Sequence, residues 1–173
     1  MTAISRRGLV ALLAAFVPAS TPGPTLPPGI PMRMTITNTG DRPERLKGAS
    51  TPVAELVELR ARQGFGADQH EVLAEGGIVI PARSFIILES LGEYPAMLGM
   101  RRPLVQGETF PVVFRFEQAG EIAATGRVRR KLDAAGVAPI PPVTVGDITI
   151  SLVSAPPSPA EHQSSTPAAT PIG

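Results

Sequence analysis

Apolar and polar residues alternate in short segments between residues 32 and 131. The clearest case is residues 109–117, where Val112, Phe114 and Phe116 alternate with the residues between them. A period of two is typical of a β-strand that buries one face. The chain then turns at Ala119–Gly120 and continues as a second alternating segment, residues 122–128. This pattern predicts a β-hairpin.

Other parts of the same region also predict strands. Residues 32–38 are rich in β-formers, and residues 71–89 indicate two more strands, broken by Gly76–Gly77 and by Pro81. Residues 53–59 fit either a strand or a short helix, and periodicity alone does not separate the two. Short strands at regular turn spacing, without a long segment of helical period, predict an all-β fold, namely an antiparallel β-sandwich or Greek-key barrel.

The first nineteen residues have the features of an export signal. Arg6 and Arg7 precede the apolar run 8–17, and small residues follow up to Ala19. The run is too short to cross a hydrocarbon core of about 30 Å as a helix. We therefore expect residues 1–19 to be a removed signal peptide with partial twin-arginine character. The mature chain would then be periplasmic or otherwise exported, without a stable membrane span. No Cys follows the apolar run, so we expect no lipoprotein anchor.

Composition divides the remaining chain into three parts. Residues 20–31 are a Pro/Gly-rich linker, and residues 32–132 carry the strand pattern of the sandwich domain. Residues 133–173 form a tail rich in Pro, Ala and Ser, which is typical of flexible segments. Within that tail, residues 146–153 fit one further strand. We expect it to pair at a sheet edge.

Charge and motifs exclude several functions. The 173 residues carry a net charge of +1, which gives no basic face for nucleic acid. The basic run 127–131 fits a solvated strand end, or a docking site for an acidic partner or anionic lipid. There is no Cys, no phosphate-binding loop and no nucleophile elbow, and the only histidines are His70 and His162. We therefore do not expect an enzyme.

The segment 93–104, "EYPAMLGMRRPL", contains side chains that could bind a soft metal ion. Met97 and Met100 have thioether donors, which Cu(I) prefers, and His70 is the nearest histidine in the sequence. Two interpretations stay open: a metal site built from these three residues, or methionines that only pack. Met32 and Met34 fit the core or the edge of a strand.

Three segments together resemble the PCu(A)C periplasmic copper chaperone family. They are "MTITNTGDRPERLKGASTPVAELVEL", "AEGGIVIPARSFIILE" and "MLGMRRPLVQGETFPVVFRFEQAGEI", in the family's order, within about residues 32–128. The resemblance implies a cupredoxin-like antiparallel β-sandwich, a periplasmic location, Cu(I) handling and a copper-accepting partner protein. We expect no cofactor, although the resemblance makes Cu(I) possible.

The family binds copper through a His, a Met and a His-x-Met pair. By the same resemblance, these positions are occupied here by Arg60, Glu71, Tyr94 and Ala96. An Arg has no lone pair to donate, and a carboxylate is a hard donor. We therefore expect no metal ligands at these positions and weak or lost copper binding, with Arg60 and Glu71 pairing instead. The alternative function is an exported non-metal binding or structural module on the same sandwich.

Overall fold

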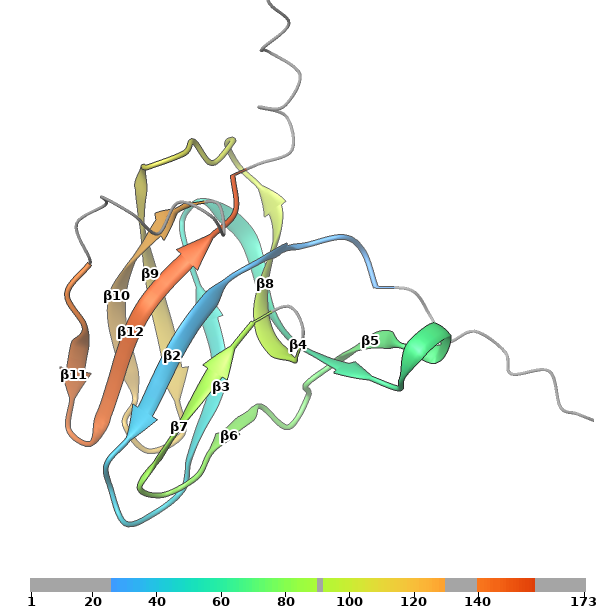
Figure 1. The fold of residues 1–173 in the computed structure, drawn as a ribbon. Helices are drawn as coiled ribbons and strands as arrows, with labels where there is room; N and C mark the ends of the chain where they lie inside the picture. Colours follow the sequence, from blue (N-terminus) through green and yellow to red (C-terminus); the bar gives the residue numbers. More distant parts are fainter. Residues whose placement is uncertain (1–25, 90–91, 130–139, 158–173) are drawn as a thin grey trace, which may run out of the picture.

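A computed structural model describes residues 26–89, 92–129 and 140–157. These residues form strands and one 3-10 helix, η1 (Gly66–Asp68). Two sheets form a sandwich (Figure 1), so the predicted all-β fold class is confirmed. No helix in the described ranges is long and apolar enough to cross a membrane. The expected signal, residues 1–19, and His162 lie outside these ranges.

The smaller sheet, sheet A, has four strands in the order β1-β8-β4-β5. Their bounds are β1 (Ile30–Pro31), β8 (Glu93–Met100), β4 (Ala54–Gln63) and β5 (His70–Leu73). The segment that fitted either a strand or a helix is therefore the start of the ten-residue strand β4. Its alternation holds, since Val57 and Leu59 point into the core while Glu58 stays half-buried between them.

The larger sheet, sheet B, has the order β6-β3-β9-β10-β12-β2-β7, and β11 pairs with β12. The bounds are β2 (Arg33–Asn38), β3 (Glu44–Ser50), β6 (Ile78–Ile80), β7 (Ser84–Leu88), β9 (Thr109–Phe116), β10 (Glu121–Val128), β11 (Val143–Val145) and β12 (Ile148–Ala155). The predicted hairpin is β9–β10, and its turn residue Gly120 has a φ of 74°, which suits glycine. Residues 71–89 contain three strands or parts of strands, one more than expected.

The last strand lies inside sheet B, not at its edge as expected. β12 pairs with β2 in antiparallel fashion and with the end of β10 in parallel fashion. Ile148 and Ile150 are buried, so the strand also contributes to the core. Sheet B therefore includes a strand from the segment rich in Pro, Ala and Ser that follows residue 132.

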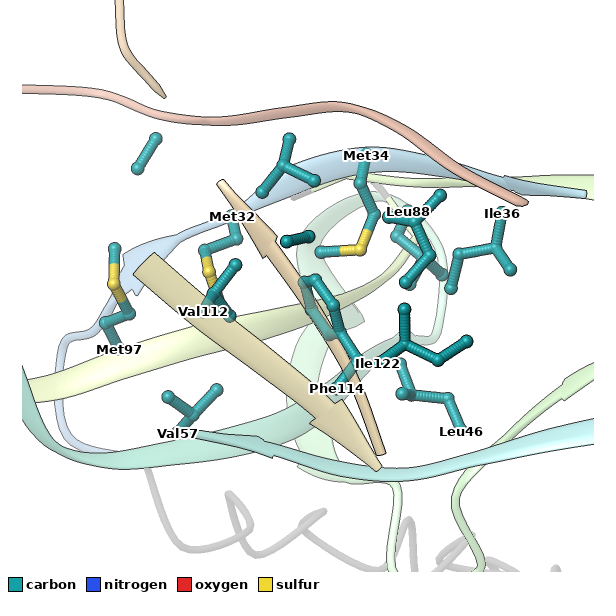
Figure 2. Close-up of a cluster of buried hydrophobic side chains, with 14 of the residues drawn as sticks. Met32, Met34, Ile36, Leu46, Val57, Leu88, Met97, Val112, Phe114 and Ile122 are labelled. Carbon is teal, nitrogen blue, oxygen red and sulfur yellow. The ribbon is translucent and has the colours of Figure 1, made fainter. Parts of the chain in front are cut away.

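Three methionines lie in the core between the sheets. Met32, Met34 and Met97 are at most 1% exposed and pack with Val112 and Phe114 (Figure 2). Flexible thioether side chains fill irregular space between two twisted sheets well. Met32 and Met34 are therefore core residues rather than edge residues, as one of the two sequence alternatives predicted.

Candidate functional site

Strand pairing brings Arg60, Glu71, Tyr94 and Ala96, the positions that the resemblance assigns to the ligands, to one face of sheet A. Arg60 of β4 is opposite Tyr94 of β8, and Glu58 is opposite Ala96. On the other side of β4, Arg62 is opposite Glu71 of β5. Directly opposed residues project from the same face, as do residues two apart on a strand. This face is the one turned away from Val57 and Met97, which belong to the core.

A guanidinium group lies at the centre of this face. The side chain of Arg60 is 1% exposed. Its Nε and Nη2 donate to Glu58 Oε2 at 3.0 and 2.8 Å, and its Nη1 donates to Glu71 Oε2 at 3.2 Å. The pairing of Arg60 with Glu71 that the sequence suggested is thus present. The side chains of Glu58 and Glu71 are 21% and 28% exposed, so these two residues connect the buried guanidinium group to the solvent.

Tyr94 completes this cluster from the neighbouring strand. Its hydroxyl donates to Glu71 Oε1 at 2.5 Å, and Arg62 Nη2 lies 3.6 Å from the same oxygen. Both oxygens of Glu71 are therefore engaged, one by Tyr94 and Arg62 and the other by Arg60. We call Glu58, Arg60, Arg62, Glu71 and Tyr94 the polar network.

The polar network shifts the ionisation of its members. Burial and the hydrogen bond to Glu71 raise the pKa of Tyr94 to about 12. The hydrogen bond from Tyr94, together with Arg60, lowers the pKa of Glu71 despite its partial burial. Burial opposes the charge on Arg60, but its hydrogen bonds and attraction to Glu58 outweigh burial and raise its pKa. At neutral pH the network therefore holds ionised Arg60 and Glu71 beside a neutral phenol.

This set of groups does not fit Cu(I). Arg60 has no lone pair and stays charged, so it repels a cation. The carboxylates of Glu58 and Glu71 are hard donors already held by hydrogen bonds. Ala96, 0% exposed, has no donor atom in its side chain. In the part of the chain that the structure describes, no group of three His, Cys, Asp or Glu residues is arranged to hold a metal ion.

The alternative donors do not come together either. Met97 is 1% exposed, lies in the core and is opposite Val57 on β4. His70 is exposed and is opposite Gln63, six residues further along β4. At about 3.3 Å per residue, this places their partners roughly 20 Å apart. Met100 is half-buried and packs against the core.

Sequence reasoning did not single out Glu58 or Arg62 as members of the site. The sequence nevertheless contains a pattern that identifies them, because Glu58, Arg60 and Arg62 occupy alternate positions of one strand. Once residues 54–63 are taken as a strand, period two places all three charged side chains on one face. Because residues 53–59 fitted a helix as well as a strand, the sequence alone did not show that these three charged side chains share a face.

Comparisons with known proteins found one family model and several solved structures. The family model described as "Putative lipoprotein LpqE-like" matches residues 10–128. The Cu(I) form of DR1885 from Deinococcus radiodurans is 27% identical, with a TM-score of 0.50, over 59% of this chain and 68% of that one. The copper-bound PCuAC domain from PmoF2 is 21% identical, with a TM-score of 0.47, over 62% and 84%. No curated protein matches the sequence.

Proposed function

The chain belongs to the LpqE-like family, and from that premise we propose an exported protein of the copper-chaperone class that binds Cu(I) weakly or not at all at the family ligand positions. The description of the family as lipoproteins supports export, as does the apolar run 8–17. The likeness to the Cu(I) form of DR1885 supports the copper-chaperone class and, with it, a copper-accepting protein as the class of partner.

The observation that carries this proposal is the guanidinium group of Arg60 between two carboxylates. A Cu(I) ion bound on this face would lie beside that fixed positive charge. Glu58 and Glu71 neutralise that charge in the free protein, but their Oε2 atoms are then occupied by the hydrogen bonds from Arg60. The side chains of Arg60, Glu71, Tyr94 and Ala96 also contain no soft donor, so Cu(I) would meet neither a thioether nor an imidazole there.

A Cu(I) titration against a competing chelator tests the proposal. We expect the unaltered protein to leave Cu(I) with the chelator. The fourfold variant Arg60→His, Glu71→Met, Tyr94→His and Ala96→Met should withdraw Cu(I) from the chelator, because it removes the guanidinium group and installs two imidazole and two thioether donors. If this variant does not fold, the double variant Arg60→His, Glu71→Met should show a smaller gain.

A matched control places the same donors elsewhere on the sandwich. Phe85→His with Ile87→Met puts a His-x-Met pair on exposed positions of β7, and it should not bind Cu(I) tightly. The proposal is wrong if the unaltered protein withdraws Cu(I) from the chelator and loses this ability on Glu71→Ala. It is also wrong if the control gains as much affinity as the fourfold variant.

A further inference from the structure

The β4–β5 hairpin carries an exposed aromatic side chain at its tip. The hairpin extends outward from the sandwich (Figure 1), and Phe65 follows the end of β4. Phe65 is 94% exposed, more than any other large hydrophobic residue in the described ranges. A phenylalanine in full contact with water gains nothing for folding, whereas its burial in a complex is favourable. Its nearly complete exposure at a projecting tip leaves the whole ring available to a partner.

The loop that presents Phe65 has a defined conformation. Gly64 and Gly66, on either side, have φ values of 84° and 58°, which favour glycine. The backbone N–H groups of Asp68 and Gln69 donate to the carbonyls of Phe65 and Gly66 at 3.2 and 3.4 Å. A Cβ atom on Gly64 would come within 2.4 Å of the carbonyl oxygen of Asp68. A loop held in this way loses little conformational freedom when it binds a partner.

The charges around Phe65 indicate the chemistry of the partner. Arg62 is engaged by Glu71 and by Gln69, 3.4 Å away. The hydrogen bonds of Asp68 within the described residues are made by its backbone: its N–H donates to the Phe65 carbonyl and its carbonyl lies 2.9 Å from His70 Nδ1, so the exposed carboxylate is left to the solvent. The tip therefore presents an aromatic ring beside an uncompensated negative charge. An anionic lipid surface would repel that charge, whereas a protein pocket with basic residues at its rim would attract it.

We propose that Phe65 anchors this hairpin in an apolar pocket, rimmed by Lys or Arg side chains, on a partner protein. Aromatic side chains buried at the centre of an interface typically dominate its binding energy. Asp68 pairs with the basic rim and orients the approach. This inference concerns the tip of the hairpin and is independent of copper binding at the polar network.

The first test identifies the partner in the native cell. A photoreactive phenylalanine analogue at position 65 should form one discrete adduct with another protein. The same analogue at position 85, a second exposed Phe on β7, should not form this adduct. The protein in the adduct is then purified and titrated with the full chain. No adduct at position 65, or the same adduct at position 85, would refute the proposal.

The second test measures the contribution of Phe65 to the purified complex. Phe65→Ala should weaken binding about 10- to 100-fold, the effect of losing one buried aromatic ring. Phe85→Ala should leave affinity unchanged. Asp68→Lys should slow association and reverse its dependence on salt. Equal affinity of the Phe65→Ala variant and the unaltered protein would overturn the inference.

A third test distinguishes binding of the tip to a partner protein from its binding to a membrane or to a second copy of the chain. The chain has no Trp, so Phe65→Trp introduces a single fluorophore whose emission reports burial at the tip. We expect its emission to shift to shorter wavelength with the purified partner. A shift with vesicles of phosphatidylglycerol would show a membrane site, and a shift with protein concentration alone would show self-association. Either result would refute the proposal.

Discussion

Tyr94 joins two strands through a single hydroxyl group. It is the only tyrosine of the chain, and it links β8 to the Glu71 carboxylate of β5. The phenol is a donor only while it is protonated. Burial first, and then this hydrogen bond, raise the pKa of Tyr94, so the native fold favours the protonated phenol.

This link predicts a loss of stability at high pH. The pKa of Tyr94 is about 12 in the folded protein, against about 10 in an unfolded chain. Because the folded value is higher, the stabilisation is complete below pH about 10 and is lost as pH rises toward about 12. The ultraviolet absorbance of tyrosinate measures this titration directly, since Tyr94 is the only contributor.

The variant Tyr94→Phe isolates the contribution of the hydroxyl group. It should lower the free energy of unfolding at neutral pH by about 1.5–3 kcal/mol, the range for a hydrogen bond to a charged group. Its stability should also lose the dependence on pH that Tyr94 causes between about 10 and 12. Denaturant unfolding at several pH values checks both. Titration of the native tyrosine near 10, as in a free peptide, would contradict the proposed link.

The arrangement of the polar network could be predicted only in part from individual residues. The pairing of Arg60 with Glu71 followed from their opposite charges at positions that the family resemblance brings together. The roles of Tyr94 and Arg62 in holding Glu71 did not follow, because they depend on the exact register of three strands. That register is set by contacts of the whole sheet rather than by the residues themselves.

At the scale of elements, the β9–β10 hairpin depends on close packing of a ring against a glycine. Phe110 of β9 is opposite Gly126 of β10 and is 0% exposed. A Cβ atom on Gly126 would lie within 2.4–2.8 Å of three atoms of the Phe110 ring. The ring therefore occupies the space that any other side chain at position 126 would need.

Gly126→Ala should consequently destabilise the protein. We expect a loss of about 1–3 kcal/mol in the free energy of unfolding, because the buried ring must move within a packed core. Gly48→Ala on β3 is the matched control: no heavy atom lies within 4 Å of its added Cβ, so its effect should stay within about 0.5 kcal/mol. Denaturant unfolding compares the two, and equal stability would show that the ring adapts freely.

Local sequence patterns predicted both strands and the turn of the β9–β10 hairpin. For β12 they predicted a strand but not its place in sheet B. The alternation of Val112, Phe114 and Phe116, followed by a Gly turn, concerns neighbouring residues, so sequence alone sufficed. A strand at 146–153 was also visible as a β-rich segment. Its place between β10 and β2 was not, because pairing between strands distant in sequence leaves no local pattern.

At the scale of the whole molecule, sheet B is continuous only with β12 in place. A chain that ends after residue 139 would lack β11 and β12 and leave backbone groups of β2 and β10 unpaired. We expect it to lose cooperative unfolding, because buried Ile148 and Ile150 are also removed from the core. Circular dichroism during thermal unfolding measures this. A chain that ends after residue 157 is the control and should unfold cooperatively.

The position of β12 also sets the order of events during synthesis. Ribosomes synthesise a chain from its N-terminus, so β2 and β10 emerge before the strand that lies between them. The two parts of sheet B on either side of β12 cannot join until residue 155 has appeared. Sheet B therefore cannot be completed until nearly the entire chain has been synthesised.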